Sequence, residues 1–299
     1  MENNIVTIDT NNYSIMAKAM GMEVDTNSSD KSGSLARLKI EHKPIMGTAE
    51  VKGKSTNVEV VPGGSYKLDV PDKGTFYSET VTIRPFIQRF MYKRFISNAN
   101  AKPGEPLGKY QKTIMSDNLS TDLKDNFGDF NCGKPTGYIK DWNALSEESK
   151  KLYQSIKRVR VVFGLVSFDN AVCSNGNSMI LDDTPFIWEI DNKDAFKIVG
   201  EPIAKLGKVK RLPVQHLINF STEQRQIPTG AVFYTPVTSL DMSKTVEITD
   251  KDQTLFGDFL AWVQNYNDYI NSQWEEKARS SISKEDKDTV EGFMEIQDA

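Results

Sequence analysis

Hydrophobic and polar residues alternate with a period of two over much of residues 35–240. Leu38 and Ile40 are flanked by charged neighbours, and the alternation resumes at Tyr66, after a proline and two glycines at 62–64. Successive side chains of a β-strand point to opposite faces, so this alternation predicts strands with one buried face. The pattern therefore predicts a mainly β fold, a β-rich α+β protein.

Two longer runs that mix apolar and basic residues predict the principal strands, at 77–96 and 157–168. Pro85 interrupts the first run, and proline cannot donate to a strand ladder, so we expect an edge position or a bulge there. The other β elements that the pattern predicts are a hairpin turn marked by Gly176 and by Asp182-Asp183, a return strand at 185–190, a strand at 214–220, a polar loop at 221–230 and a strand at 231–240.

Three stretches predict helices. Ser146 is a suitable N-cap for a helix over 146–157, and a second helix is expected over 194–206. Apolar residues recur every three or four positions over 255–274, which indicates an amphipathic helix that packs on the β body. Residues 97–131 show no period, which predicts a long loop.

These patterns divide the chain into four parts. Residues 1–34 are expected to be a flexible N-terminal arm, and 35–240 the main domain. Residues 241–278 would hold the C-terminal helix, and 279–299 an acidic, disordered tail that carries a few apolar residues.

The charge of the chain is unevenly distributed, although its net value is only −4. Residues 31–112 hold fifteen Lys and Arg against seven Asp and Glu, while 134–160 and 193–225 each hold seven against three. Residues 241–299 reverse this balance, with six against fourteen. A ligand meets the local field, so the acidic whole-chain charge does not argue against a polyanion as partner.

Several classes of protein do not fit the sequence. No apolar run reaches the roughly 18 to 20 residues of a membrane span, and residues 1–10 lack the apolar region of a secretion signal. Cys132 and Cys173 are the only cysteines, which argues against a disulfide framework and suits a reducing cytoplasm. We therefore expect a cytoplasmic protein, in the host cell if the source is viral, with no membrane partner.

Motifs for catalysis, cofactors and metals are also lacking. The sequence contains no GxxxxGK[ST] phosphate loop and no GxSxG nucleophile elbow, and its two cysteines and two histidines show no metal-ligand spacing. We expect no cofactor, no bound metal and no catalytic residue.

A nuclease remains a further alternative. Asp182, Asp183, Glu189 and Asp191, with Lys193 nearby, lie on two sides of the predicted hairpin. Carboxylates beside a lysine can hold Mg²⁺ and steady an attacking water. The two aspartates, a few positions after Gly176, are more simply explained by turn formation.

The strongest chemical signal is the interleaving of rings and cations over 82–95. Cations neutralise phosphates, and flat rings accept unpaired bases, so this combination is typical of proteins that bind single-stranded nucleic acid. Similar mixtures recur at 157–168 and 205–234. A strand with one buried and one solvated face would give the same alternation, so a purely structural role stays open.

On these segments the chain resembles bacteriophage single-stranded DNA-binding proteins with an OB-like core. The resemblance rests on the strands 83–95 and 157–166, on Pro185-Phe-Ile-Trp188, on Gly230-Ala-Val-Phe-Tyr-Thr-Pro236 and on the acidic tail. It implies an elaborated OB-like barrel with long inserted loops, which binds single-stranded DNA without sequence preference in phage DNA replication or recombination. It also implies replication proteins as partners of the tail, although the chain ends in Gln-Asp-Ala rather than in an aromatic residue.

The residues expected to bind DNA belong to the basic and aromatic segments. Ten would contact phosphates: Arg84, Arg89, Lys93, Arg94, Lys157, Arg158, Arg160, Lys208, Lys210 and Arg211. Four would stack on bases: Phe86, Phe90, Tyr92 and Tyr234. The main rival hypothesis is a phage structural or assembly protein that binds no nucleic acid, and no sequence signal indicates the oligomeric state.

Overall fold

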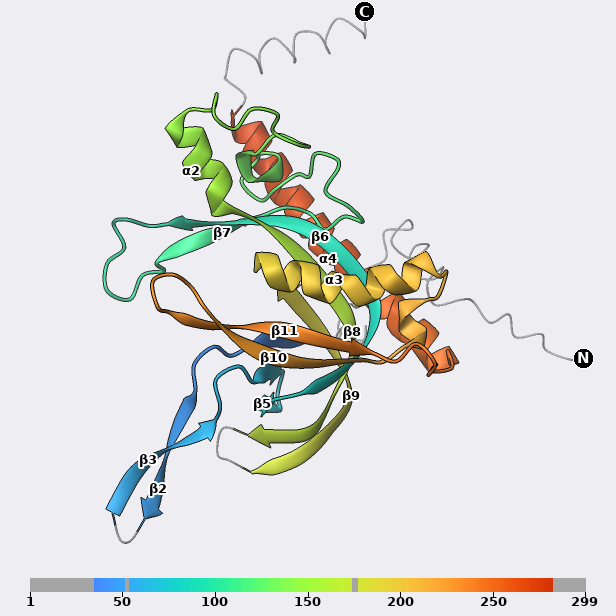
Figure 1. Ribbon diagram of the computed structural model, residues 1–299. Helices are drawn as coiled ribbons and strands as arrows, with labels where there is room; N and C mark the ends of the chain where they lie inside the picture. The colour runs from blue at the N-terminus through green and yellow to red at the C-terminus, as the bar shows by residue number, and fades with distance from the viewer. Residues whose placement is uncertain (1–34, 52–53, 174–176, 282–299) are drawn as a thin grey trace, which may run out of the picture. The chain divides into compact units, whose positions relative to one another are not determined.

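The alternating segments form a closed β-barrel of five strands (Figure 1). The structure is a computed structural model, and it describes residues 35–51, 54–173 and 177–281. The barrel strands are β1 (Ala36–Ile40), β4 (Tyr66–Val70), β5 (Gly74–Ser78), β8 (Ile156–Cys173) and β9 (Ser178–Ile190). Consecutive strands pair antiparallel, and a short parallel pairing of β9 with β1 closes the ring.

Further strands extend this sheet beyond the barrel. They are β6 (Val81–Ser97), β7 (Gly108–Lys112), β10 (Ile218–Gln226) and β11 (Val232–Leu240). β6 pairs with β8 along most of its length, β10 pairs with the start of β6, and β7 pairs with its end. Between β1 and β4, β2 (Ile45–Val51) and β3 (Lys54–Val61) form a separate two-stranded ribbon (Figure 1).

The structure confirms the bulge at Pro85 and corrects the extent of the strand around it. The run 77–96 is not one strand, because β5 ends at Ser78 and β6 begins at Val81. The register between β6 and β8 shifts between Pro85 and Ile87. Opposite the shift lies Gly164, where a Cβ would lie 2.2 Å from the carbonyl oxygen of Arg84, so only glycine fits this close approach.

Three predicted connections contain strand residues, and one of them is the long loop expected at 97–131, which includes β7. Asp182 and Asp183 do not form the hairpin turn but lie within β9, where the register shifts and Asp183 has a positive φ of 38°. The predicted polar loop at 221–230 is also wrong over its first half, because 221–226 continue β10 and pair with β11. Exposed polar side chains gave these residues no apolar alternation to signal a strand.

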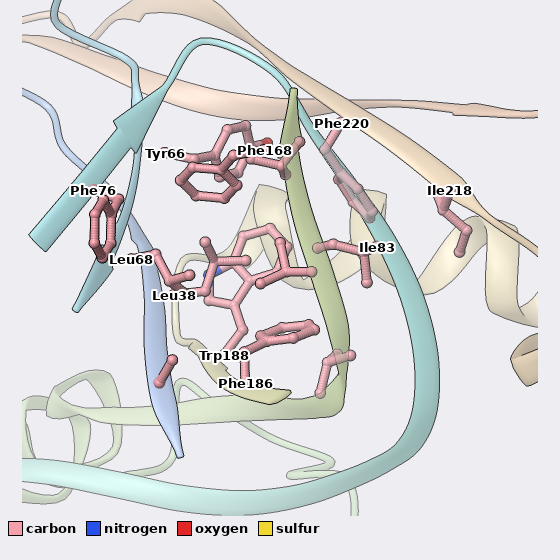
Figure 2. Packing of buried hydrophobic residues seen from close by; sticks show 14 of the residues in the cluster. Leu38, Tyr66, Leu68, Phe76, Ile83, Phe168, Phe186, Trp188, Ile218 and Phe220 are labelled. Carbon is pink, nitrogen blue, oxygen red and sulfur yellow. The ribbon is translucent and has the colours of Figure 1, made fainter. Parts of the chain in front are cut away.

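The barrel core is built from the inward faces of all five barrel strands (Figure 2). Trp188 lies near its centre, edge-on to Tyr66 at 5.9 Å and to Phe220 at 5.6 Å between ring centroids. The fully buried hydroxyl of Tyr66 donates to the carbonyl of Ser221, so its polar atom is satisfied.

The three predicted helices form with modest changes in their ends. They are α2 (Glu147–Ser155), α3 (Lys193–Lys208) and α4 (Asp250–Ser281), accompanied by the short 3₁₀ turns η1 (Asn131–Gly133) and η2 (Pro213–Gln215). Ser146 caps α2 as predicted, by accepting a hydrogen bond from the N–H of Ser149.

The longer helices cover two different parts of the sheet. Ala195 and Val199 of α3 pack into the barrel core. Phe259 and Val263 of α4 pack instead on outward side chains of β6 and β8, among them Met91 of β6. These residues form a second core cluster. This packing explains the apolar period of α4.

The predicted N-terminal arm at 1–34 lies outside the described residues, as does the tail from residue 282 onward. Residues 279–281, which we expected to belong to the tail, are the last residues of α4. In the part of the chain that the structure describes, no helix combines the length and the hydrophobicity needed to cross a membrane.

Candidate nucleic-acid interface

Two of the three predicted basic segments lie side by side. The antiparallel register of β6 and β8 places Phe90 opposite Arg160, and Lys93 opposite Lys157. Alternation then sends neighbouring side chains to opposite faces, so some of the predicted residues point toward α4 and others toward α3.

The face toward α3 carries a stacked arrangement of rings and cations. Phe90 packs on Phe196 of α3, with 5.9 Å between ring centroids. The guanidinium of Arg160 lies 5.0 Å from the Phe90 ring and 4.6 Å from the Phe196 ring, and that of Arg158 lies 5.8 Å from Phe196. Cations at these distances interact favourably with the ring faces.

A pocket of about 420 Å³ opens beside these rings, between the start of β8, the end of β9 and the start of α3. Four cationic side chains line it, and Asp191 is its one acid. The full lining is Lys134, Gln154, Ile156, Lys157, Arg158, Asp191, Asn192, Lys193 and Phe196. We call this site the cationic pocket.

Asp191 is already engaged by two lysines. Its carboxylate lies 3.5 Å from the Lys157 ammonium and 3.2 Å from that of Lys93. Glu189 is bound in the same way by Lys93 and by Lys112, the latter at 2.9 Å. The charges of Glu189 and Asp191 raise the pKa of Lys93 although burial opposes its ionisation. The acids at this end of the barrel are thus neutralised.

The other three cations of the cationic pocket are not neutralised in this way. Within the described residues, Lys134, Arg158 and Lys193 form no ion pair with an acid. Burial lowers the pKa of the Lys134 ammonium, and the neighbouring charge of Arg158 lowers it further. Like charges close together in a hollow repel one another, and a bound anion would remove that repulsion.

A smaller pocket of about 140 Å³ shares Asp191 and Asn192 with the cationic pocket. Tyr234 lines it and lies nearly parallel to the His42 ring, at 6.5 Å between centroids. Its ring rests on Gly64, where a Cβ would lie 2.4 Å from Cδ1 of Tyr234. The two pockets therefore adjoin at Asp191 and Asn192.

Arg84 is not available to a phosphate, contrary to expectation. Its guanidinium is buried and binds both oxygens of Asp252, at 2.9 and 3.1 Å. It also donates to the carbonyls of Val214 and Glu247. Neighbouring Phe86 packs against Phe259 of α4. Both side chains have structural roles, because they fasten α4 to the sheet.

Two further expected contacts are occupied within the fold. Tyr92 is buried in a small cluster with Leu123 and Cys132, so its ring cannot stack on a base. Arg89 forms an ion pair with Asp117 at 2.9 Å, on the α4 side of the sheet.

The remaining expected cations fall into two groups. Arg94 is half-buried on β6, and no acid of the described chain pairs with it. Lys208, Lys210 and Arg211 are exposed at the end of α3. A helix of 16 residues is about 24 Å long, so this second group lies far from Lys193 and the cationic pocket.

Sequence reasoning missed Lys134 and Phe196 as parts of the site, and considered Lys193 only for a nuclease. The charge balance of 134–160 contained the signal for Lys134, but the residue lies in an irregular segment with no period to place it. Phe196 lies in a predicted helix, whose contact with β8 depends on the tertiary fold.

The acids considered for a nuclease do not all lie together. Asp183 and Asp191 lie eight positions apart along and just beyond one strand, which corresponds to about 26 Å. Among the described residues, no group of three or more His, Cys, Asp or Glu side chains is arranged to hold a metal ion. Glu189 and Asp191 are instead held in ion pairs with lysines.

Comparison of the chain with protein-family models, with curated proteins and with solved structures found no match.

Proposed function

We propose that this protein binds single-stranded DNA without reading its sequence, and that the cationic pocket holds the phosphates. The observation that carries the proposal is the convergence of Lys134, Arg158 and Lys193, none of which pairs with an acid of the described chain, in one hollow. Cations that the fold does not neutralise are available to a polyanion. By contrast, three of the four cations of β6 are paired internally.

The barrel architecture supports the same proposal. We propose that the five-stranded barrel is OB-like, with α3 packing into its core and the β2–β3 ribbon as an enlarged connection between its first two strands. Barrels of this kind bind oligonucleotides on their strands and connecting loops. A role in phage DNA replication or recombination, with partner proteins at the acidic end of the chain, is the biological setting that we propose.

The residues proposed to contact DNA are fewer than those expected from the sequence. Lys134, Lys157, Arg158 and Lys193 would bind phosphates, and Tyr234 would lie against a base beside them. Lys157 would exchange Asp191 for a phosphate or bridge the two, since it is exposed and only 3.5 Å from that carboxylate.

The experiment is a titration of labelled oligo-dT with the full chain, followed by fluorescence anisotropy, with a duplex of equal length as competitor. We expect oligo-dT to bind and the duplex to compete poorly, because paired and stacked bases cannot reach the rings. Absence of oligo-dT binding at low salt would overturn the proposal and favour a structural or assembly protein. Equal competition by the duplex would contradict the preference for single strands.

A further inference from the structure

Phe95 and Tyr110 form an exposed pair of aromatic rings on the ribbon of β6 and β7. They lie directly opposite each other in the register of the two strands. Their ring centroids are 5.1 Å apart, and the side chains are 46% and 50% exposed. Both rings are therefore accessible to a ligand.

Lys93 connects this pair to the cationic pocket. Its ammonium lies 4.8 Å from the centre of the Tyr110 ring and 3.2 Å from the carboxylate of Asp191. Asp191 in turn lines the cationic pocket. The rings therefore adjoin the site proposed to bind phosphates.

The fold keeps the two rings in place. Phe95 lies over Gly108, where a Cβ would be 2.6 Å from Cζ of the ring and 2.3 Å from the carbonyl oxygen of Ile96. Asn126 ties β7 down from outside the ribbon, since it donates to the carbonyl of Tyr110 and accepts from the N–H of Lys112. The ring pair is thus a positioned surface and not the tip of a free loop.

A cross-strand ring pair also stabilises a ribbon by itself, so exposure alone does not identify a ligand. The second observation is the cationic surroundings. Lys93 lies over the Tyr110 ring, and its ion-pair partner Asp191 lines the cationic pocket together with Lys134, Arg158 and Lys193. Because Lys93 is itself paired with Glu189 and Asp191, the phosphate next to a base stacked on these rings would bind the unpaired cations of the pocket.

We propose that Phe95 and Tyr110 are a stacking platform for unpaired bases of a nucleic acid whose phosphates occupy the cationic pocket. This inference rests on the proposed function and adds that the bases themselves contribute to affinity.

The test compares oligo-dT with an abasic oligonucleotide of equal length, which keeps the phosphates but lacks the bases. We expect the variant Phe95→Ala/Tyr110→Ala to bind oligo-dT about tenfold more weakly than the unaltered chain, and the abasic strand equally well. Tyr269→Ala on α4 is the matched control, because Tyr269 is 62% exposed and distant in sequence from the ribbon. It should bind both strands as the unaltered chain does.

A second measurement uses the unaltered chain, so its result does not depend on whether the double variant folds. In the unaltered chain, an oligonucleotide carrying 5-iododeoxyuridine should cross-link on irradiation to the peptides that contain Phe95 or Tyr110, because this base reacts with stacked rings. Cross-links only elsewhere would overturn the platform.

The outcomes separate this inference from the proposed function. If the unaltered chain binds neither strand, the proposed function fails. If it binds oligo-dT and the double variant binds it equally well, only the platform fails. A weaker binding of the double variant to both strands would also contradict the platform, because it would indicate a lost phosphate contact or a distorted ribbon.

Discussion

The two ends of the paired strands β6 and β8 put the same residue type to opposite uses. Arg84 and Arg158 both come from basic, ring-rich runs and were both expected to contact phosphates. Arg84 is buried against Asp252, whereas Arg158 is exposed in the cationic pocket with no acidic partner in the described chain. The comparison shows that a cation is available to a ligand when the fold places no acid beside it. The strand that carries the cation does not decide this.

The acid at the Arg84 end comes from far away in sequence. Asp252 lies at the start of α4, 168 positions from Arg84, and also accepts hydrogen bonds from Thr249. Burial opposes ionisation of Asp252, but hydrogen bonds from Thr249 and Arg84 and the charge of Arg84 outweigh it and lower its pKa. This end of the strand pair is therefore closed by its own ion pair.

The largest expected effect concerns this closed end. Replacing Arg84 by Ala leaves Asp252 buried without its partner, which should lower the free energy of unfolding by about 3–5 kcal/mol. Urea denaturation followed by circular dichroism measures it. The matched variant Arg158→Ala should change stability by less than about 0.5 kcal/mol, as for ordinary surface positions. Equal losses in the two variants would mean that the ends do not differ as described.

The next effect concerns the other end of the strand pair, where the cationic pocket lies. The triple variant Lys134→Gln/Arg158→Gln/Lys193→Gln should bind oligo-dT about 100-fold more weakly, a loss of about 2.7 kcal/mol. Its stability should be unchanged or slightly higher, because the repulsion between Lys134 and Arg158 is removed. Anisotropy and urea denaturation together check both statements. Unaltered affinity, or a large loss of stability, would show that these cations serve the fold.

A third prediction concerns the turn beneath Tyr234. Gly64 has a φ of +92°, and a Cβ there would also meet the side-chain oxygen of Thr222 at 2.8 Å. Gly64→Ala should therefore lower stability by about 1–3 kcal/mol and displace the Tyr234 ring. Thermal denaturation gives the stability change. Gly74→Ala is the control, since Gly74 also has positive φ but no atom within 4 Å of its Cβ position. If Gly74→Ala lost as much stability as Gly64→Ala, the loss would come from backbone strain alone and not from contact with Tyr234 and Thr222.

The smallest expected effect is the pH dependence of the closed end. Because folding lowers the pKa of Asp252, its contribution to stability is present at neutral pH. That contribution is lost as the pH falls from about 4, the ordinary pKa of Asp, through the lower value of the folded state. Stability measured against pH should therefore fall less steeply in Asp252→Asn than in the unaltered chain. The same dependence of stability on pH in both proteins would contradict an ionised pair of Arg84 and Asp252.

The sequence was sufficient for the features that depend on local patterns. Alternation located the strands around Leu38 and Tyr66, Pro85 marked a bulge, and Ser146 capped the helix that follows it. In each case the signal comes from neighbouring residues, whose backbone geometry or burial follows from side-chain type.

Features that depend on distant partners could not be predicted. Nothing near Arg84 in sequence indicates Asp252, and nothing near Phe90 indicates Phe196. The strand at 221–226 carried no apolar alternation because most of its side chains are exposed, and Asp182-Asp183 has turn-forming chemistry inside a strand. Side-chain type alone does not reveal which tertiary contact a residue makes.

The salt dependence of oligo-dT binding tests most directly whether the unpaired cations hold phosphates. In a plot of the logarithm of the binding constant against the logarithm of the salt concentration, each phosphate contact on a single strand contributes about 0.7 to the slope. Loss of Lys134, Arg158 and Lys193 should therefore reduce the slope by about 2. The same replacement of Lys205, Lys208 and Lys210, which are exposed at the far end of α3, should leave it unchanged. An equal slope in the first variant and in the unaltered chain would contradict the account.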